Sequence, residues 1–192
     1  MRGDEVTAAA LAAQDGDTAA AARFVRATQA DVWRFCANLA EPAEAEDLTQ
    51  ETYLRAFRAL PRFAGRSTAR TWLLAIARRV CADHVRDRRR RPRTHPVALL
   101  AGTEGGETEA GRSPAHRPAV PDIGDGVALR ALLATVEPGR REAFVLTQVV
   151  GLSYAEAAEV CGCPVGTIRS RVARARDHLV AELEARPDAG SA

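Results

Sequence analysis

The stretch that decides the fold is residues 151–176, which read GLSYAEAAEVCGCPVGTIRSRVARAR. Ser153 and Glu156 have the spacing of a capping box, which begins a short helix. Gly162 is suited to end that helix, and Pro164 is suited to begin the next one. Two short helices joined by a tight turn are typical of a helix-turn-helix, which places its second helix in a groove of DNA.

The second of these helices is amphipathic and carries arginine on its free side. At 100° per residue, its apolar stripe consists of Val165, Ile168, Val172, Ala175 and Leu179. Arg174 and Ser170 lie on the opposite side, and Gly166 lets the backbone approach a ligand closely. Arginine can donate two hydrogen bonds to guanine, and a serine hydroxyl can bind phosphate. An arginine-rich face can also be plain solvated surface, but the cap, turn, glycine and arginine coincide here, so we predict a DNA-reading helix.

Charge is distributed unevenly along the 192-residue chain, although its formal net charge is only +2. Residues 61–95 contain 11 arginines and 2 acidic residues, whereas residues 1–60 contain 6 arginines and 10 acidic residues. A strongly basic segment beside an acidic one favours contact with a phosphate backbone. The alternative is a solvated helix face without a partner.

The first half of the chain has the apolar spacing of three amphipathic helices. We expect Asp17 to cap the first, the second to begin after Pro42 and stop at Pro61, and Ser67 to cap the third. Residues 92–124 contain five prolines and a patch rich in Gly and Glu, which predicts a flexible linker. No stretch of the chain has the alternation of a strand.

These patterns predict an all-α protein with two small helical domains joined by a flexible linker. The first domain has three or four helices, and the second has four with the helix-turn-helix. The expected divisions are a tail or short helix at 1–17, a domain at 18–91, the linker at 92–124, a domain at 125–186 and a disordered tail at 187–192.

The composition argues against catalysis and against metal binding. Cys36 and Cys81 fall at apolar helix positions and are expected in the core, whereas Cys161 and Cys163 flank one glycine without the further ligands of a zinc site. Four scattered histidines and no paired carboxylates give no catalytic residues, so we expect no enzyme, cofactor or metal. No signal peptide and no apolar run near 18 residues is present, so we expect a cytoplasmic protein without membrane insertion.

Three stretches, in order, resemble bacterial sigma factors of the sigma-70 superfamily. Residues 47–60, DLTQETYLRAFRAL, resemble the segment that docks on RNA polymerase. Residues 70–86, RTWLLAIARRVCADHVR, resemble the helix that reads the promoter −10 element, and residues 151–176 resemble the helix-turn-helix that reads the −35 element. The resemblance covers about residues 18–185. Two domains with nothing else match the group IV, extracytoplasmic-function (ECF) sigma factors, and among these the actinobacterial SigC-type subgroup.

The resemblance implies three sets of contacts and the partners that make them. Contacts with the β′ clamp helices of core RNA polymerase would fall on Asp47, Gln50, Glu51, Leu54 and Arg55. Contacts with the −10 element, including a loop that captures a flipped base, would fall on Phe63, Ala64, Gly65, Arg66, Ser67, Arg70, Arg78 and Arg79. Contacts with the −35 element would fall on Thr167, Arg169, Ser170, Arg171 and Arg174. The second domain would also bind the β flap of the polymerase. An anti-sigma factor is a further candidate partner.

One position departs from the family, and one other function class stays open. Position 173 is often larger in relatives and contacts DNA there, but it is Ala173 in this chain. The sequence therefore implies an alternative sigma factor that directs promoter-specific transcription initiation. The alternative is a helix-turn-helix regulator with a separate effector or dimerisation domain. That alternative explains the second domain but neither the polar pattern from Asp47 to Glu51 nor the basic third helix.

Overall fold

The computed structural model describes residues 3–90 and 123–185, and every regular element within them is a helix. This confirms the all-α class. The predicted linker at 92–124 lies outside the described residues except for Ile123 and Gly124, which belong to a helix. The predicted tail at 187–192 also lies outside them.

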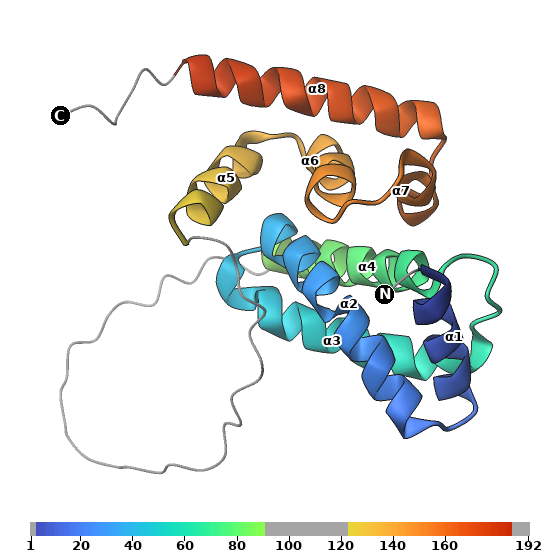
Figure 1. The fold of residues 1–192 in the computed structure, drawn as a ribbon. Coiled ribbons are helices and arrows are strands. Elements are labelled where there is room, and N and C mark those ends of the chain that lie inside the picture. Colours follow the sequence, from blue (N-terminus) through green and yellow to red (C-terminus); the bar gives the residue numbers. More distant parts are fainter. Residues whose placement is uncertain (1–2, 91–122, 186–192) are drawn as a thin grey trace, which may run out of the picture.

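The first group of helices forms the lower half of Figure 1. Its core contains Phe24, Phe35, Leu73 and Leu74, whose side chains are fully buried. Burying such large apolar side chains is the main force that holds the helices together. The elements are α1 (Gly3–Gln14), α2 (Thr18–Leu39), the short turn η1 (Pro42–Glu44), α3 (Ala45–Ala59), the turn η2 (Leu60–Arg62) and α4 (Ala69–Arg90).

The caps of this group agree with the sequence in one case and differ in the other. The Asp17 side chain accepts a hydrogen bond from the backbone N–H of Ala20 at 2.9 Å and so caps α2, as predicted. The prediction that Ser67 caps α4 is wrong. The Thr68 hydroxyl accepts from the backbone N–H of Thr71 at 3.1 Å, because the helix begins one residue later than the sequence pattern indicated.

The second group is built around the helix-turn-helix. Ser153 and Glu156 form the predicted capping box, and Gly162 ends the helix in the left-handed conformation with φ of +63°. A five-residue π turn follows α6 and was not expected from the sequence. The elements are α5 (Ile123–Thr135), α6 (Pro138–Phe144), the π turn η3 (Val145–Val149), α7 (Tyr154–Cys161) and α8 (Val165–Glu184).

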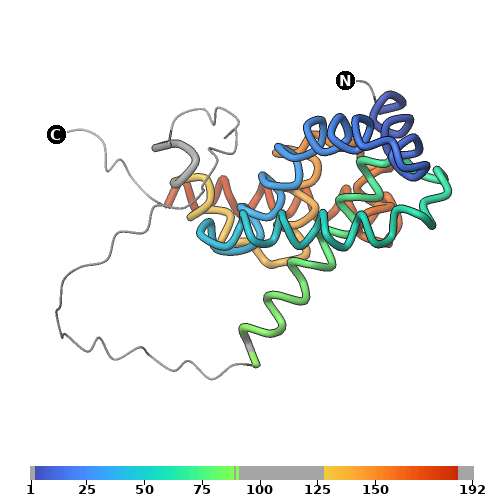
Figure 2. Tube along the Cα trace, turned by 90° about the horizontal axis from the view of Figure 1, so that it is seen from below, coloured from blue at the N-terminus to red at the C-terminus, as the bar shows by residue number. Residues whose placement is uncertain are grey.

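The two groups pack against each other, with α8 on the outside and α5 to α7 between it and the first group (Figure 1). Helix α7 lies on α4, while α5 and α6 contact α2. Figure 2 shows the same packing from below. Buried residues of the two groups belong to one continuous apolar cluster. The helix predicted to read the −10 element is therefore covered by the second group, and α8 faces away from it.

Candidate nucleic-acid and polymerase interfaces

Helix α3 presents the residues that the resemblance assigned to polymerase. Asp47 and Gln50 are exposed, and Leu54 is 54% exposed although it is apolar. Spacings of three and four residues place these side chains on one face of the helix. The opposite face buries Leu48, Thr52 and Ala56. Leu54 and its polar neighbours are therefore all accessible to a partner.

Glu51 and Arg55 belong to the same face but also bond to each other. The Arg55 guanidinium donates to the Glu51 carboxylate at 2.7 Å and to the Asp83 carboxylate of α4 at 2.8 Å. These bonds, the one to Asp83 first, raise the pKa of Arg55 above its usual value. Arg55 therefore joins the α3 face to the helix predicted to read DNA.

The loop between η2 and α4 contains the residues predicted to capture a base. Ala64, Gly65 and Arg66 are exposed, and Gly65 has φ of +65°, which favours glycine. Phe63 instead is buried, with its ring centroid 4.8 Å from that of Trp72. The ring of Phe63 therefore belongs to the core and is not open to a base.

Two of the arginines predicted to contact the −10 element are held by partners within the chain. The Arg70 guanidinium donates to the Asp31 carboxylate of α2 and to the backbone carbonyl of Val150, each at 2.7 Å. Arg78 donates to the Glu142 carboxylate of α6 at 2.6 Å. Val150 and Glu142 both belong to the second group of helices. Arg79, the next residue, is exposed.

Glu142 is the centre of this contact between the groups. Burial opposes the charge of Arg78, but the Glu142 carboxylate outweighs it and raises the pKa of Arg78. The thiol of Cys161 also points at Glu142, with Sγ 3.8 Å from the carboxylate. Burial, followed by the charge of Glu142, raises the pKa of Cys161 to about 12. No sequence pattern pointed to Glu142, because an ion pair between distant segments leaves no periodic signal.

The residues predicted to read the −35 element lie together on α8. Arg169, Ser170 and Arg174 are exposed, while Ile168 and Val172 on the other face are buried. The Ser170 hydroxyl donates to the backbone carbonyl of Thr167 at 3.0 Å. Thr167 and Arg171 are half-buried at the flanks. The open face of α8 is therefore the polar and cationic one.

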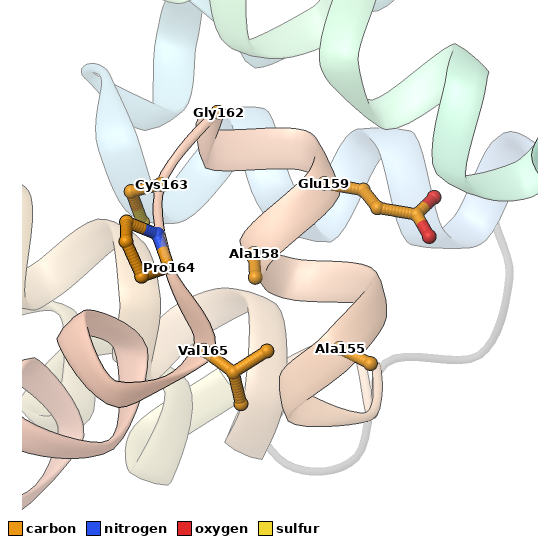
Figure 3. Close-up of a pocket in the computed structure, with 7 residues that line it drawn as sticks. All are labelled: Ala155, Ala158, Glu159, Gly162, Cys163, Pro164 and Val165. Carbon is orange, nitrogen blue, oxygen red and sulfur yellow. The ribbon is translucent and has the colours of Figure 1, made fainter.

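A shallow hollow lies beside the turn of the helix-turn-helix (Figure 3). Its lining is mostly small and apolar because α7 carries Ala155 and Ala158 there. Among the described lining residues only Glu159 is charged, and its carboxylate points away from the turn in Figure 3. A hollow without a cation or a buried polar group is poorly suited to a phosphate or a cofactor.

Neither a metal cluster nor a membrane-spanning helix is found within the described residues. In residues 3–90 and 123–185, no three or more His, Cys, Asp and Glu side chains are grouped so as to hold a metal ion. None of the helices in these ranges combines the length and the apolar character needed to cross a bilayer.

The sequence of the chain is similar to those of known sigma factors. The family Sigma-70 region 2 matches residues 24–91, and Sigma-70, region 4 matches residues 126–179. The ECF RNA polymerase sigma factor SigC of Mycobacterium tuberculosis is 52% identical over 185 residues, which cover 94% of this chain and 92% of that protein. The ECF RNA polymerase sigma-E factor of Salmonella typhimurium is 30% identical, covering 86% of this chain and 87% of that one.

Solved structures give the same assignment of fold. CnrH in complex with the cytosolic domain of CnrY has a TM-score of 0.71 at 23% identity and covers 95% of this chain and 99% of its own. The sigma factor RpoE, in complex with the anti-sigma factor NepR from Bartonella quintana, has a TM-score of 0.63 at 28% identity, covering 86% and 97%. Both family matches coincide with the two groups of helices, and the chain belongs to the ECF sigma factors of the sigma-70 family, which bind core RNA polymerase and promoter DNA to direct transcription initiation.

Proposed function

We propose that the three faces described above divide the work of promoter recognition. The α3 face docks on the β′ clamp helices through Asp47, Gln50, Glu51, Leu54 and Arg55. The loop at 63–67 and the arginines of α4 bind the −10 element, and Thr167, Arg169, Ser170, Arg171 and Arg174 on α8 bind the −35 element. The observation that carries this proposal is the separation of an exposed polar and apolar strip on α3 from the cationic face of α8.

The packed arrangement is proposed to be the free form of the protein. The Val150 carbonyl and the Glu142 carboxylate of region 4 accept hydrogen bonds from Arg70 and Arg78, so a promoter cannot use these two arginines at the same time. Polymerase, whose β flap binds region 4 in this proposal, separates the two regions. In this proposal the protein acts in the cytoplasm as a subunit of the polymerase and is not itself an enzyme. In this proposal an anti-sigma factor is a further partner that holds the packed form; the similar sigma factor RpoE was solved in complex with the anti-sigma factor NepR.

Run-off transcription tests the function directly. Purified protein with core RNA polymerase should start transcription at defined sites in a genomic library where neither starts it alone. The mapped start sites supply the cognate −10 and −35 sequences. Failure of the protein to bind core polymerase would overturn the proposal and favour a helix-turn-helix regulator.

A double substitution tests the docking face. Gln50 is exposed and Glu51 bonds only on the surface of α3, so Q50A with E51A should weaken binding to core polymerase at least tenfold, at roughly 1 kcal/mol per lost polar contact. The melting temperature should stay nearly constant, because neither side chain is in the core. The matched control is Gln29→Ala, an exposed glutamine on α2. Unfolding of the double variant would show that these residues are structural and would refute the docking assignment.

A further inference from the structure

Helix α1 lies ahead of the Sigma-70 region 2 match, which begins at residue 24, yet it is packed into the same domain. Its buried residues Val6, Ala9 and Ala10 join the core, and the helix contacts α2, α4 and the turn η2. Figure 1 shows α1 beside the segment that joins α3 to α4. The helix is therefore fixed next to the loop assigned above to the −10 element.

Gln14, the last residue of α1, contacts the entrance of that loop. Its side-chain amide donates to the backbone carbonyl of Pro61 at 2.9 Å and lies 3.5 Å from the carbonyl of Phe63. Backbone carbonyls in an irregular segment need donors that the segment itself does not supply. Gln14 supplies one from 47 residues away in the sequence.

Thr7, two turns earlier on α1, contacts the exit of the loop. Its hydroxyl donates to the carbonyl of Gly3 at 2.9 Å and accepts from the backbone N–H of Ala69 at 3.1 Å. Ala69 is the first residue of α4, and its N–H has no carbonyl partner within the helix. One rigid helix therefore bonds to both ends of the loop, while Ala64 to Arg66 between them stay exposed.

We propose that α1 is a brace that fixes the shape of the −10 loop, with Gln14 and Thr7 as positioning residues for recognition of the −10 element. The proposal rests on the function proposed for the loop. A loop that must present a pocket to one extruded base loses affinity if it has to be ordered on binding, because the ordering entropy then counts against the complex. Fixing both ends before the promoter arrives removes part of that cost. Neither residue needs to touch DNA for this effect.

The test uses holoenzyme and a promoter fragment mapped by run-off transcription, with its −10 element either cognate or changed at one base. The readout is the ratio of open-complex formation on the two fragments. Gln14→Met keeps the length of the side chain and removes the hydrogen-bond donor. The ratio should therefore decrease by a factor of about two to ten, which corresponds to the free energy of one hydrogen bond. Thr7→Val should lower it within the same range. Core-polymerase affinity and preference at the −35 element should not change.

Three controls separate the possible outcomes. Gln29→Met removes an exposed amide on α2 and should leave the ratio unchanged. Arg66→Ala alters the loop itself. If that variant keeps its preference for the cognate −10 element, the loop assignment is refuted. If Arg66→Ala loses the preference but Gln14→Met does not, only the brace is refuted. Val6→Ala weakens the packing of α1 without removing either hydrogen bond. If Val6→Ala and Gln14→Met lower the melting temperature and the ratio in the same proportion, α1 only stabilises the domain and the brace is wrong.

Discussion

Helices α4 and α8 are both long, both carry arginine and both are assigned to DNA, but the second group of helices covers part of α4 and leaves the cationic face of α8 open. On α4, Arg70 and Arg78 are bonded to groups of the second domain at 2.7 Å and 2.6 Å. On α8, Arg169 and Arg174 are exposed, and no partner holds them among the described residues. The chemistry of a reading face is thus set by its own helix, whereas its availability is set by what packs on it.

The geometry explains how one region can cover the other and keep its own face open. Region 4 contacts region 2 mainly through α7, with smaller contributions from η3, α5 and α6, while α8 lies on the far side of these elements. The contacts use the side chain of Glu142 and the backbone of Val150, neither of which is on the −35 face. The free protein should therefore bind −35 DNA with its full intrinsic affinity and −10 DNA with a reduced one.

The largest effect is expected from the open face. Arg174→Ala should cost about 1–3 kcal/mol at a cognate −35 element, since a guanidinium that reads a base contributes in that range. The measurement is binding of holoenzyme to cognate and scrambled −35 DNA. Arg176→Ala is the matched control on the same helix, because Arg176 is already bonded to Gln148 at 2.8 Å. Equal losses on both DNAs for Arg174→Ala would show that the side chain holds the backbone and does not read bases.

A smaller effect is expected from opening the covered face. Glu142→Gln removes the charge that holds Arg78, and this partly buried pair is worth about 1 kcal/mol. Affinity of the free protein for single-stranded −10 DNA should rise about fivefold, and −35 binding should not change. The affinity of holoenzyme should also stay constant, because its two regions are already separated.

The control for this variant is Glu159→Gln, which removes an exposed carboxylate on α7. It changes the net charge equally, and within the described residues the Glu159 carboxylate makes no hydrogen bond or ion pair with α4 that would be lost. A similar rise in −10 affinity with both variants would mean that loss of negative charge, and not release of Arg78, causes the effect.

The contrast between the helices also separates what the sequence could predict from what it could not. The caps at Asp17 and Ser153 are local signals, because the donor lies within three residues of the acceptor. The start of α4 was misplaced because Ser67 and Thr68 are adjacent hydroxyls of similar capping strength. The face of α8 followed from its apolar stripe, but the pairing of Arg78 with Glu142 joins residues 64 positions apart. Such a contact depends on how two finished domains meet, which no short pattern encodes.

The smallest effect is expected at the end of α4, where arginines can reach phosphates only. Arg90 is exposed and unpaired within the described residues, whereas Arg88 donates to both carboxylate oxygens of Glu44 at 3.1 Å. Arg90→Ala should weaken holoenzyme binding to all sequences alike and reduce the slope of log K against log salt by about 0.9, the value for one phosphate contact. Arg88→Ala should change the slope less, because Glu44 already neutralises that charge. The experiment measures promoter affinity at several salt concentrations on cognate and scrambled DNA. A loss confined to cognate DNA for Arg90→Ala would place a base-reading contact at the end of α4. It would contradict the expectation that the arginines there contact only phosphates.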